Sequence, residues 1–217
     1  MATAASAAIP KVHLHIGHEK RASGSGGSRT HIHPVTGEAL AEVPLAGPAE
    51  VEAAVAKAEA AREGWRRTNP EVRGQILSRL ADLLMEKQKE FGRMAALDGG
   101  TPLMQGERGV ETAASWMRYY AGWCDKLTGE LMSTFDTRGE FSYSVPEPIG
   151  IVGIINTWNG PLIGMGMKVS PALAAGNCVI LKPAEITPFA PELFAQCCKE
   201  AGIPDGVISV LPGTGEA

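Results

Sequence analysis

Residues 150–188 read GIVGIINTWNGPLIGMGMKVSPALAAGNCVILKPAEITP and set the architecture of the chain. Two continuous apolar runs occur in this stretch, at 150–155 and 177–182, and such runs indicate strands that are buried on both faces. The residues between them, at about 161–175, are apolar and long enough for a helix. Strand, helix and strand in this order predict a right-handed parallel βαβ unit.

The pattern continues toward the C-terminus. A helix is predicted at about 188–201, where Gly202, Ile203 and Pro204 end it, and a third apolar strand at 207–211 follows. The fold class is therefore α/β, with the first half of a doubly wound, nucleotide-binding parallel sheet. The sequence ends at Ala217, shortly after Pro212-Gly213-Thr214-Gly215, where we expect the next helix to begin.

Three helices are predicted upstream from helical spacing and punctuation. One begins at Pro48, a second spans about 70–98, and a third spans about 101–127. The third contains four aromatic residues at three- and four-residue spacing, which we interpret as core packing: Trp116, Tyr119, Tyr120 and Trp123. Two hairpins are predicted as well, a surface hairpin at 33–48 and a longer one at 129–148 that projects and pairs with another chain.

Residues 1–30 are expected to be a flexible segment. The Gly/Ser-rich run at 22–29 has no strand before it and no helix after it, so we interpret it as a loop and not as a phosphate cradle. The run HLHIGH at 13–18 suggests a metal site, but no thiol or acidic cluster accompanies it in the sequence. We therefore predict an exposed, histidine-containing strand and no metal.

Composition excludes several function classes. The net charge is −4 and no long basic stripe occurs, so nucleic acid is not an expected partner. No uninterrupted apolar stretch is long enough for a membrane span. The N-terminus has no apolar core of a secretory signal. Four cysteines without C-x-x-C pairs suit a reduced compartment, so we expect a cytoplasmic protein: Cys124, Cys178, Cys197 and Cys198.

Two turns follow the predicted strands, at the sheet edge where open parallel sheets bind ligands. Lys182 and Glu185 follow the second strand. An ammonium that donates and a carboxylate that accepts match a ribose diol, although a solvated ion pair that caps the next helix would look the same. Such a carboxylate would repel a 2′-phosphate, which favours NAD over NADP. After the first strand, Asn156 or Asn159 could donate to a developing oxyanion, or could simply form the turn.

Three motifs between Glu147 and Gly215 resemble the aldehyde dehydrogenase superfamily. Its members carry E-P-x-G-x6-P-W-N-x-P, then P-A-L-A-x-G-N-x4-K-P-[SA]-E-x-T-P, then G-x-P-x-G-V-x4-P-G-x-G, and the spacing here agrees throughout. Weaker similarity extends upstream, so the resemblance covers residues 31–217. It implies the N-terminal part of that family's fold: a helical portion at 31–128, an oligomerisation-type hairpin at 129–148, and the first part of a Rossmann-type NAD-binding sheet at 149–217.

The resemblance also implies roles for individual residues. Asn159 corresponds to the oxyanion-stabilising asparagine of the family. The residues that correspond to its cofactor-binding positions are Ile155, Trp158, Lys182, Ala184, Glu185 and Gly215. Lys182 and Glu185 would hold the adenosine ribose, and Gly215 would lie on the adenine side. We leave Lys168, in the next helix, as a structural residue.

The implied activity is NAD-dependent oxidation of a small aldehyde to an acid through a cysteine thiohemiacetal, in a homo-oligomer of two or four subunits. The family pattern departs at Thr157, which replaces a proline, and at Gly160, which we expect to widen the substrate tunnel. Motifs that carry the family's nucleophilic cysteine and basic glutamate do not occur, so we expect the chain alone to be inactive. The alternative is a shortened, non-catalytic relative that binds nucleotide or full-length subunits.

Overall fold

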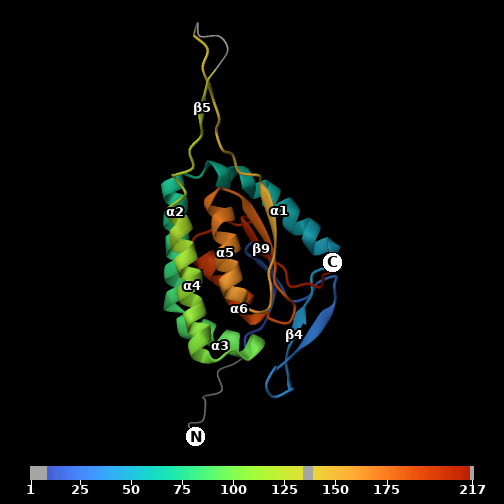
Figure 1. Cartoon of the computed structure of the whole chain (residues 1–217). Coiled ribbons are helices and arrows are strands. Elements are labelled where there is room, and N and C mark those ends of the chain that lie inside the picture. The colour runs from blue at the N-terminus through green and yellow to red at the C-terminus, as the bar shows by residue number, and fades with distance from the viewer. Residues whose placement is uncertain (1–8, 134–138, 216–217) are drawn as a thin grey trace.

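The computed structural model describes residues 9–133 and 139–215, which form an α/β fold around one open, mixed sheet (Figure 1). The strand order is β2-β1-β9-β8-β7. The strands of this sheet are β1 (Leu14–Ile16), β2 (Glu19–Arg21), β7 (Ile151–Ile155), β8 (Cys178–Lys182) and β9 (Ile208–Val210). Strands β7, β8 and β9 pair in parallel, which confirms the predicted half of a doubly wound sheet.

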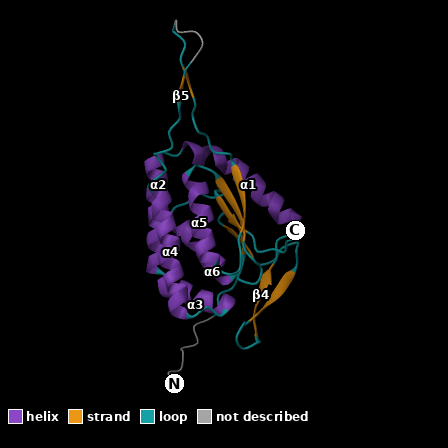
Figure 2. Cartoon of the chain, viewed as in Figure 1, coloured by secondary structure: helices purple, strands orange, loops and turns teal. Residues whose placement is uncertain are grey.

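Helices cover both faces of this sheet (Figure 2). The connections between the parallel strands, α5 (Pro161–Ala174) and α6 (Phe189–Glu200), pack on one face, and α1 (Pro48–Arg67) packs on the other. The N-terminus of α1 is held by Glu50, whose carboxylate accepts hydrogen bonds from the backbone N–H groups of Gly47 and Ser25. The Gly/Ser-rich run is thus tied to the start of a helix.

A second layer of helices packs against α5 and α6. It consists of α2 (Pro70–Glu86), α3 (Gln88–Gly99) and α4 (Leu103–Ala121). The single helix predicted at 70–98 is wrong, because the chain leaves the helix at Lys87 and starts again at once. No glycine or proline marks this break. It lets α3 approach α4 so closely that a Cβ on Gly106 would lie 2.9 Å from the Cα of Gly92.

The predicted core packing of the aromatic residues of α4 holds only in part: Tyr120 is half-buried against the core, but the aromatic side of α4 is not its core face. Tyr119 and Trp123 are 56% and 41% exposed, and the four rings contact one another along the surface of the helix and the turn after it. Small and aliphatic side chains are buried in their place: Val110, Ala113, Ala114, Met117 and Ala121. The close approach of α4 to α3 and α5 leaves room for these side chains and not for indole rings.

The segment expected to be flexible contributes two strands to the main sheet. β1 pairs with β2 and, through His15 and Val210, with β9, in both cases antiparallel. Its side chains are not exposed as predicted, because Leu14 and Ile16 pack beneath α1 while His15 is buried on the opposite side, next to α6. Alternation alone could not reveal a strand that is buried on both faces.

Two hairpins lie outside the main sheet. β3 (Ser28–Ile32) pairs with β4 (Ala39–Pro44), slightly earlier than the hairpin predicted at 33–48. β5 (Leu131–Met132) pairs with β6 (Ser142–Tyr143) in an arm that projects from the body (Figure 1). The turn predicted at 136–140 lies partly outside the described residues. Among the described helices, none combines the length and apolar character that a membrane crossing requires.

Candidate functional site

The two predicted turns lie side by side at the carboxyl ends of β7 and β8. Ile155 and Lys182 are opposite each other in the parallel register, and the backbone N–H of Asn156 donates to the carbonyl oxygen of Lys182 at 2.9 Å. This hydrogen bond to the end of β8 therefore fixes where the loop after β7 begins. This edge is where parallel sheets present their ligand sites.

The structure assigns different roles to the two asparagines of the first turn. Asn156 is buried, and its Nδ2 donates to the carbonyl oxygen of Pro161 at 2.8 Å, so its carboxamide braces the turn against the start of α5. Gly164 makes room for this side chain, since a Cβ there would lie 2.3 Å from Asn156 Oδ1. Asn156 is a structural residue and leaves Asn159 as the candidate donor.

Asn159 is exposed, and its carboxamide makes no hydrogen bond within the part of the chain that the structure describes. It borders a small cavity of about 90 Å³ between the start of α5 and helices α3 and α4. Gly160 and Pro161 line the same cavity. The first amides of α5 point to this end of the helix and carry a partial positive charge, which adds to the effect of a carboxamide donor on a nearby anion.

Lys182 and Glu185 form the predicted polar pair. Lys182 Nζ lies 3.8 Å from Glu185 Oε2, and both side chains are about a quarter exposed. The structure adds a cation that the sequence did not reveal, because Arg29 Nη1 from β3 lies 3.7 Å from Glu185 Oε1. Glu185 therefore has a cation near each of its oxygens. Arg29 is far away in the chain, and only the fold brings it to this turn.

A cleft of about 310 Å³ runs along the ends of the parallel strands. It brings together three of the predicted cofactor residues, Ile155, Lys182 and Gly215, and Ile155 is 75% exposed there. An exposed aliphatic side chain beside a partly exposed ion pair fits the apolar and polar parts of a nucleotide. The residues present thus fit a nucleoside at this edge.

The remaining predicted positions lie around this cleft but do not line it. Ala184 is half-buried in the turn between Lys182 and Glu185. Trp158 is 62% exposed and borders a different cavity of about 300 Å³, together with Arg29 and Thr187. Lys168 Nζ donates to the carbonyl oxygen of Ile155 at 2.8 Å. This bond holds the end of β7 in place, which agrees with a structural role for Lys168.

The four cysteines are buried and lie apart from both cavities at the strand ends. Burial raises the pKa of the Cys178 thiol to about 11 and that of Cys197 to about 12. It also raises the pKa of Cys124, and that of Cys198 well above its ordinary value. A thiolate is the reactive form, so these surroundings oppose nucleophilic chemistry at each cysteine.

An open sheet with parallel β7, β8 and β9, helices on both faces and a polar cleft at the strand ends places the chain among nucleotide-binding α/β folds. A family model described as the aldehyde dehydrogenase family matches residues 21–217, and the chain therefore belongs to that family. This confirms the resemblance that the three sequence motifs indicated.

Curated relatives agree with this assignment. The cytosolic 10-formyltetrahydrofolate dehydrogenase of Xenopus tropicalis is 39% identical over 196 residues, which cover 87% of this chain and 22% of the relative. The putative aldehyde dehydrogenase DhaS of Bacillus subtilis is 39% identical over 197 residues, which cover 89% of this chain and 39% of the relative. The chain thus spans well under half the length of these relatives.

Solved structures show the same fold. PnpE, crystallised in complex with nicotinamide adenine dinucleotide, has a TM-score of 0.92 and 32% identity, with 96% of this chain and 42% of that chain covered. The NAD⁺ complex of an aldehyde dehydrogenase from Bacillus cereus has a TM-score of 0.90, 34% identity and coverage of 95% and 42%. An NADP-dependent enzyme from E. coli is also similar, with a TM-score of 0.91, 30% identity and coverage of 95% and 43%.

Proposed function

We propose that this chain supplies the ribose-binding and oxyanion-stabilising part of an NAD-dependent enzyme that oxidises an aldehyde to a carboxylic acid. The observation that carries the proposal is the cleft at the ends of β7, β8 and β9, where Ile155, Lys182 and Gly215 come together beside Glu185. Solved relatives that carry NAD support this choice of cofactor. When bound, NAD would accept a hydride from the substrate.

The residues of the cleft would divide the recognition of the adenosine portion. Glu185 would accept a hydrogen bond from a ribose hydroxyl, while Lys182 would donate one to the neighbouring hydroxyl oxygen. Ile155 would cover an apolar face of the nucleotide, and Gly215 would leave space on the adenine side. Trp158 and Ala184 would shape the loops that border the cofactor.

Asn159 would act on the substrate. Its free carboxamide would donate to the carbonyl oxygen as negative charge develops there, and the start of α5 would add its partial charge. A carboxamide does not titrate, so this donor would work across the physiological pH range. The family reaction also needs a nucleophilic thiolate and a base, and the buried cysteines of this chain do not fit the role of the nucleophile.

Nucleotide binding tests the proposal directly. We would titrate NAD into the purified chain by calorimetry and compare Glu185→Gln and Lys182→Met with Glu52→Gln, a control at an exposed position of α1. We expect saturable binding that weakens about tenfold or more in the two cleft variants and stays unchanged in the control. Absence of binding, or equal weakening in all three variants, would reject the cleft as the ribose site.

We also propose a second, non-enzymatic function. In this alternative the chain is a non-catalytic relative that pairs with full-length subunits through the projecting arm of β5 and β6. The shape of the arm favours it (Figure 1). Size-exclusion chromatography with a full-length relative, before and after deletion of residues 130–143, tests this function. Co-elution that requires the arm would support it, and unchanged elution would contradict it.

A further inference from the structure

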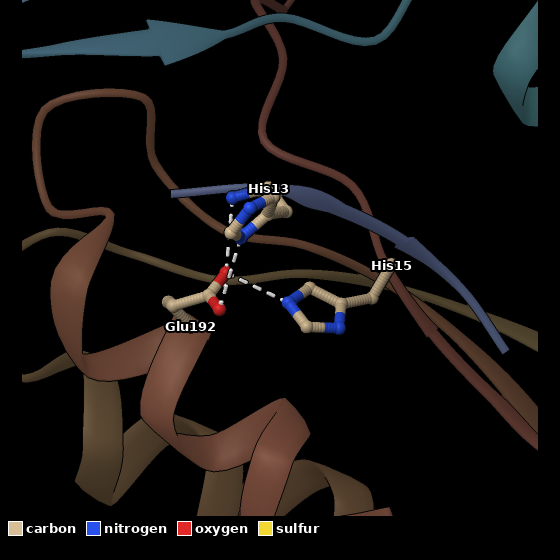
Figure 3. Close-up of side chains that lie close together, drawn as sticks. All are labelled: His13, His15 and Glu192. Atoms are coloured by element: carbon tan, nitrogen blue, oxygen red, sulfur yellow. Dashed lines mark hydrogen bonds and ion pairs between the residues drawn. The ribbon is translucent and has the colours of Figure 1, made fainter. Parts of the chain in front are cut away.

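His13, His15 and Glu192 converge at one point between β1 and α6, and none of the three lines the strand-end cleft (Figure 3). The two histidines are two positions apart on an extended segment, so their rings share one side of it. Glu192 lies in the first turn of α6 and points between the two rings. Its Oε2 lies 2.7 Å from His15 Nε2, and its Oε1 lies 3.3 Å from His13 Nδ1.

The cluster is buried and its carboxylate is held in place from outside. The side chain of Glu192 is 1% exposed, that of His15 is 5% exposed, and that of His13 is 19% exposed. Gln196 Nε2 donates to Glu192 Oε1 at 2.8 Å, and the backbone N–H of His13 donates to Oε2 at 2.9 Å. Such outer contacts orient a carboxylate ligand and are typical of metal sites.

Two imidazoles and one carboxylate are a ligand set that suits zinc and similar divalent ions. The three candidate ligand atoms lie within 4.8 Å of one another. Small side-chain rotations would bring them to the separation of about 3.3 Å that tetrahedral zinc requires.

A fourth position is accessible. A hollow of about 440 Å³ adjoins the cluster and is lined by His15, Lys20 and Gln196 among others, so a water molecule has a path to the ion. Lys20 Nζ lies 3.4 Å from Glu192 Oε1, where it competes with a cation. The Lys20 side chain is 42% exposed, so it is free to turn toward solvent when an ion binds.

We propose that His13, His15 and Glu192 bind one Zn²⁺ ion, with water as the fourth ligand, and that this ion fastens β1 to α6. No segment of the sequence places these three residues together, since His15 and Glu192 are 177 positions apart. The site is structural, because it lies on the opposite side of β9 from β7 and the candidate catalytic loop.

Zinc binding by the chain without a polyhistidine tag tests the proposal. After treatment with a chelator and dialysis, we would titrate Zn²⁺ by calorimetry and measure bound metal by mass spectrometry. We expect one equivalent to bind, with affinity lowered at least about tenfold in His15→Gln and in Glu192→Gln. His33→Gln, in the turn between β3 and β4, is the matched control and should bind like the unchanged chain.

Two further variants keep the test decisive if the buried substitutions disturb folding. His13→Gln alters the more exposed ring and should lower zinc affinity while the circular dichroism spectrum stays unchanged. Lys20→Met removes the competing cation and should raise the affinity. Failure to bind one equivalent of Zn²⁺, or equal affinity in the unchanged chain and His13→Gln, would overturn the proposal in favour of a simple ion-pair cluster.

Discussion

At the scale of single residues, the two asparagines of the turn after β7 have the same chemistry but different surroundings. Asn156 donates to the carbonyl oxygen of Pro161, whereas the carboxamide of Asn159 has no hydrogen-bond partner among the described residues and borders a cavity. The difference follows from their places in the turn: Asn156 directly follows β7 and is buried, whereas Asn159 lies two residues before α5 and is exposed. Only the exposed residue is available to a ligand.

We expect Asn159→Ala to lower kcat about 10²- to 10³-fold in an enzyme that contains this chain together with the nucleophile and base of the family. The reason is the loss of one donor to the developing oxyanion. Steady-state kinetics with an aldehyde and NAD measures the effect, and Asn69→Ala, at the cap of α2, serves as a control distant from the cavity. An effect confined to KM would remove Asn159 from this role.

Arg29 leads to a second prediction at this scale, on the choice between NAD and NADP. In the proposed site Glu185 would disfavour a 2′-phosphate, while Arg29, whose Nη1 lies 3.7 Å from Glu185 Oε1, would offer a phosphate a bidentate donor. We expect Arg29→Gln to weaken NADP binding about tenfold and to change NAD binding much less. Calorimetric titrations of both nucleotides measure this, and equal losses for the two would show that Arg29 does not contact the 2′ position.

At the scale of secondary structure elements, Glu50 joins the Gly/Ser-rich loop to α1. The hydrogen bond from the Ser25 hydroxyl, with those from the Gly47 and Ser25 amides, outweighs burial and lowers the pKa of Glu50 to about 2 from 4.5. Because the folded pKa is depressed, Glu50 stabilises the fold above pH 4.5, and this contribution is lost as the pH falls toward 2.

We therefore expect Glu50→Gln to lower the free energy of unfolding by about 1–3 kcal/mol at pH 7 and to flatten its decline between pH 4.5 and 2. Urea unfolding at a series of pH values measures both. Glu52→Gln, two residues along the same helix but exposed, should change neither quantity. A decline of unchanged steepness in Glu50→Gln would mean that other carboxyl groups cause it.

Arg73 joins three helix ends in a similar way. Its guanidinium donates from Nε to the carbonyl oxygen of Ala174 at 3.0 Å and from Nη1 to that of Thr68 at 3.1 Å, and it lies over the ring of Trp65. It thus satisfies carbonyl groups at the ends of α1 and α5 that have no partner within their own helices.

Replacement of Arg73 by methionine keeps most of the side-chain volume and removes all of these donors. We expect Arg73→Met to lower the free energy of unfolding by about 2–4 kcal/mol, because buried carbonyl groups are left without partners. The exposed Arg62→Met should change the free energy of unfolding very little. Chemical denaturation compares the two, and equal small effects would show that water replaces the guanidinium.

The elements themselves were largely predictable from the sequence, and the reasons are local. The three parallel strands and the helices between them were predicted within two residues, because apolar runs and Pro or Gly punctuation are local signals. The break at Lys87 has no such signal and accompanies the close packing of Gly92 and Gly106. The exposure of Tyr119 and Trp123 accompanies the same packing.

Contacts between distant segments could not be predicted in this way. The sequence identified Lys182 and Glu185, because both lie in one turn, but Arg29 reaches that turn from another sheet. Likewise, the run HLHIGH at 13–18 has no acidic cluster with it in the sequence, and only the fold places Glu192 of α6 beside it. Side-chain pairs within one turn were thus predictable from the sequence. Pairs between residues that are distant in the sequence and that only the fold brings together were not.

At the scale of the whole molecule, β7 is the open edge of the sheet. The Asn156 N–H and the Gly150 carbonyl oxygen bond to β8, so the alternate residues Ile151, Gly153 and Ile155 present their amides to the open side. An exposed, apolar strand edge is a template for pairing with other strands.

We expect the isolated chain to self-associate through β7, and we expect Gly153→Pro to reduce this association because proline removes one outward amide. Gly153 has open space where a Cβ would be, so Gly153→Ala is a matched control that keeps the amide. Sedimentation velocity at several concentrations measures the effect. Equal association in the proline and alanine variants would locate the contact elsewhere.

The place of β1 beside β9 has a consequence for how the protein is made. A ribosome that adds about 5–20 residues per second needs roughly 10–40 s between the synthesis of β1 and that of β9. During this interval β1 lacks its neighbour β9, and Leu14 and Ile16 lack Leu211, which follows β9 and packs with them. The nascent chain therefore presents an unpaired edge at β1 that a chaperone is able to hold until β9 emerges.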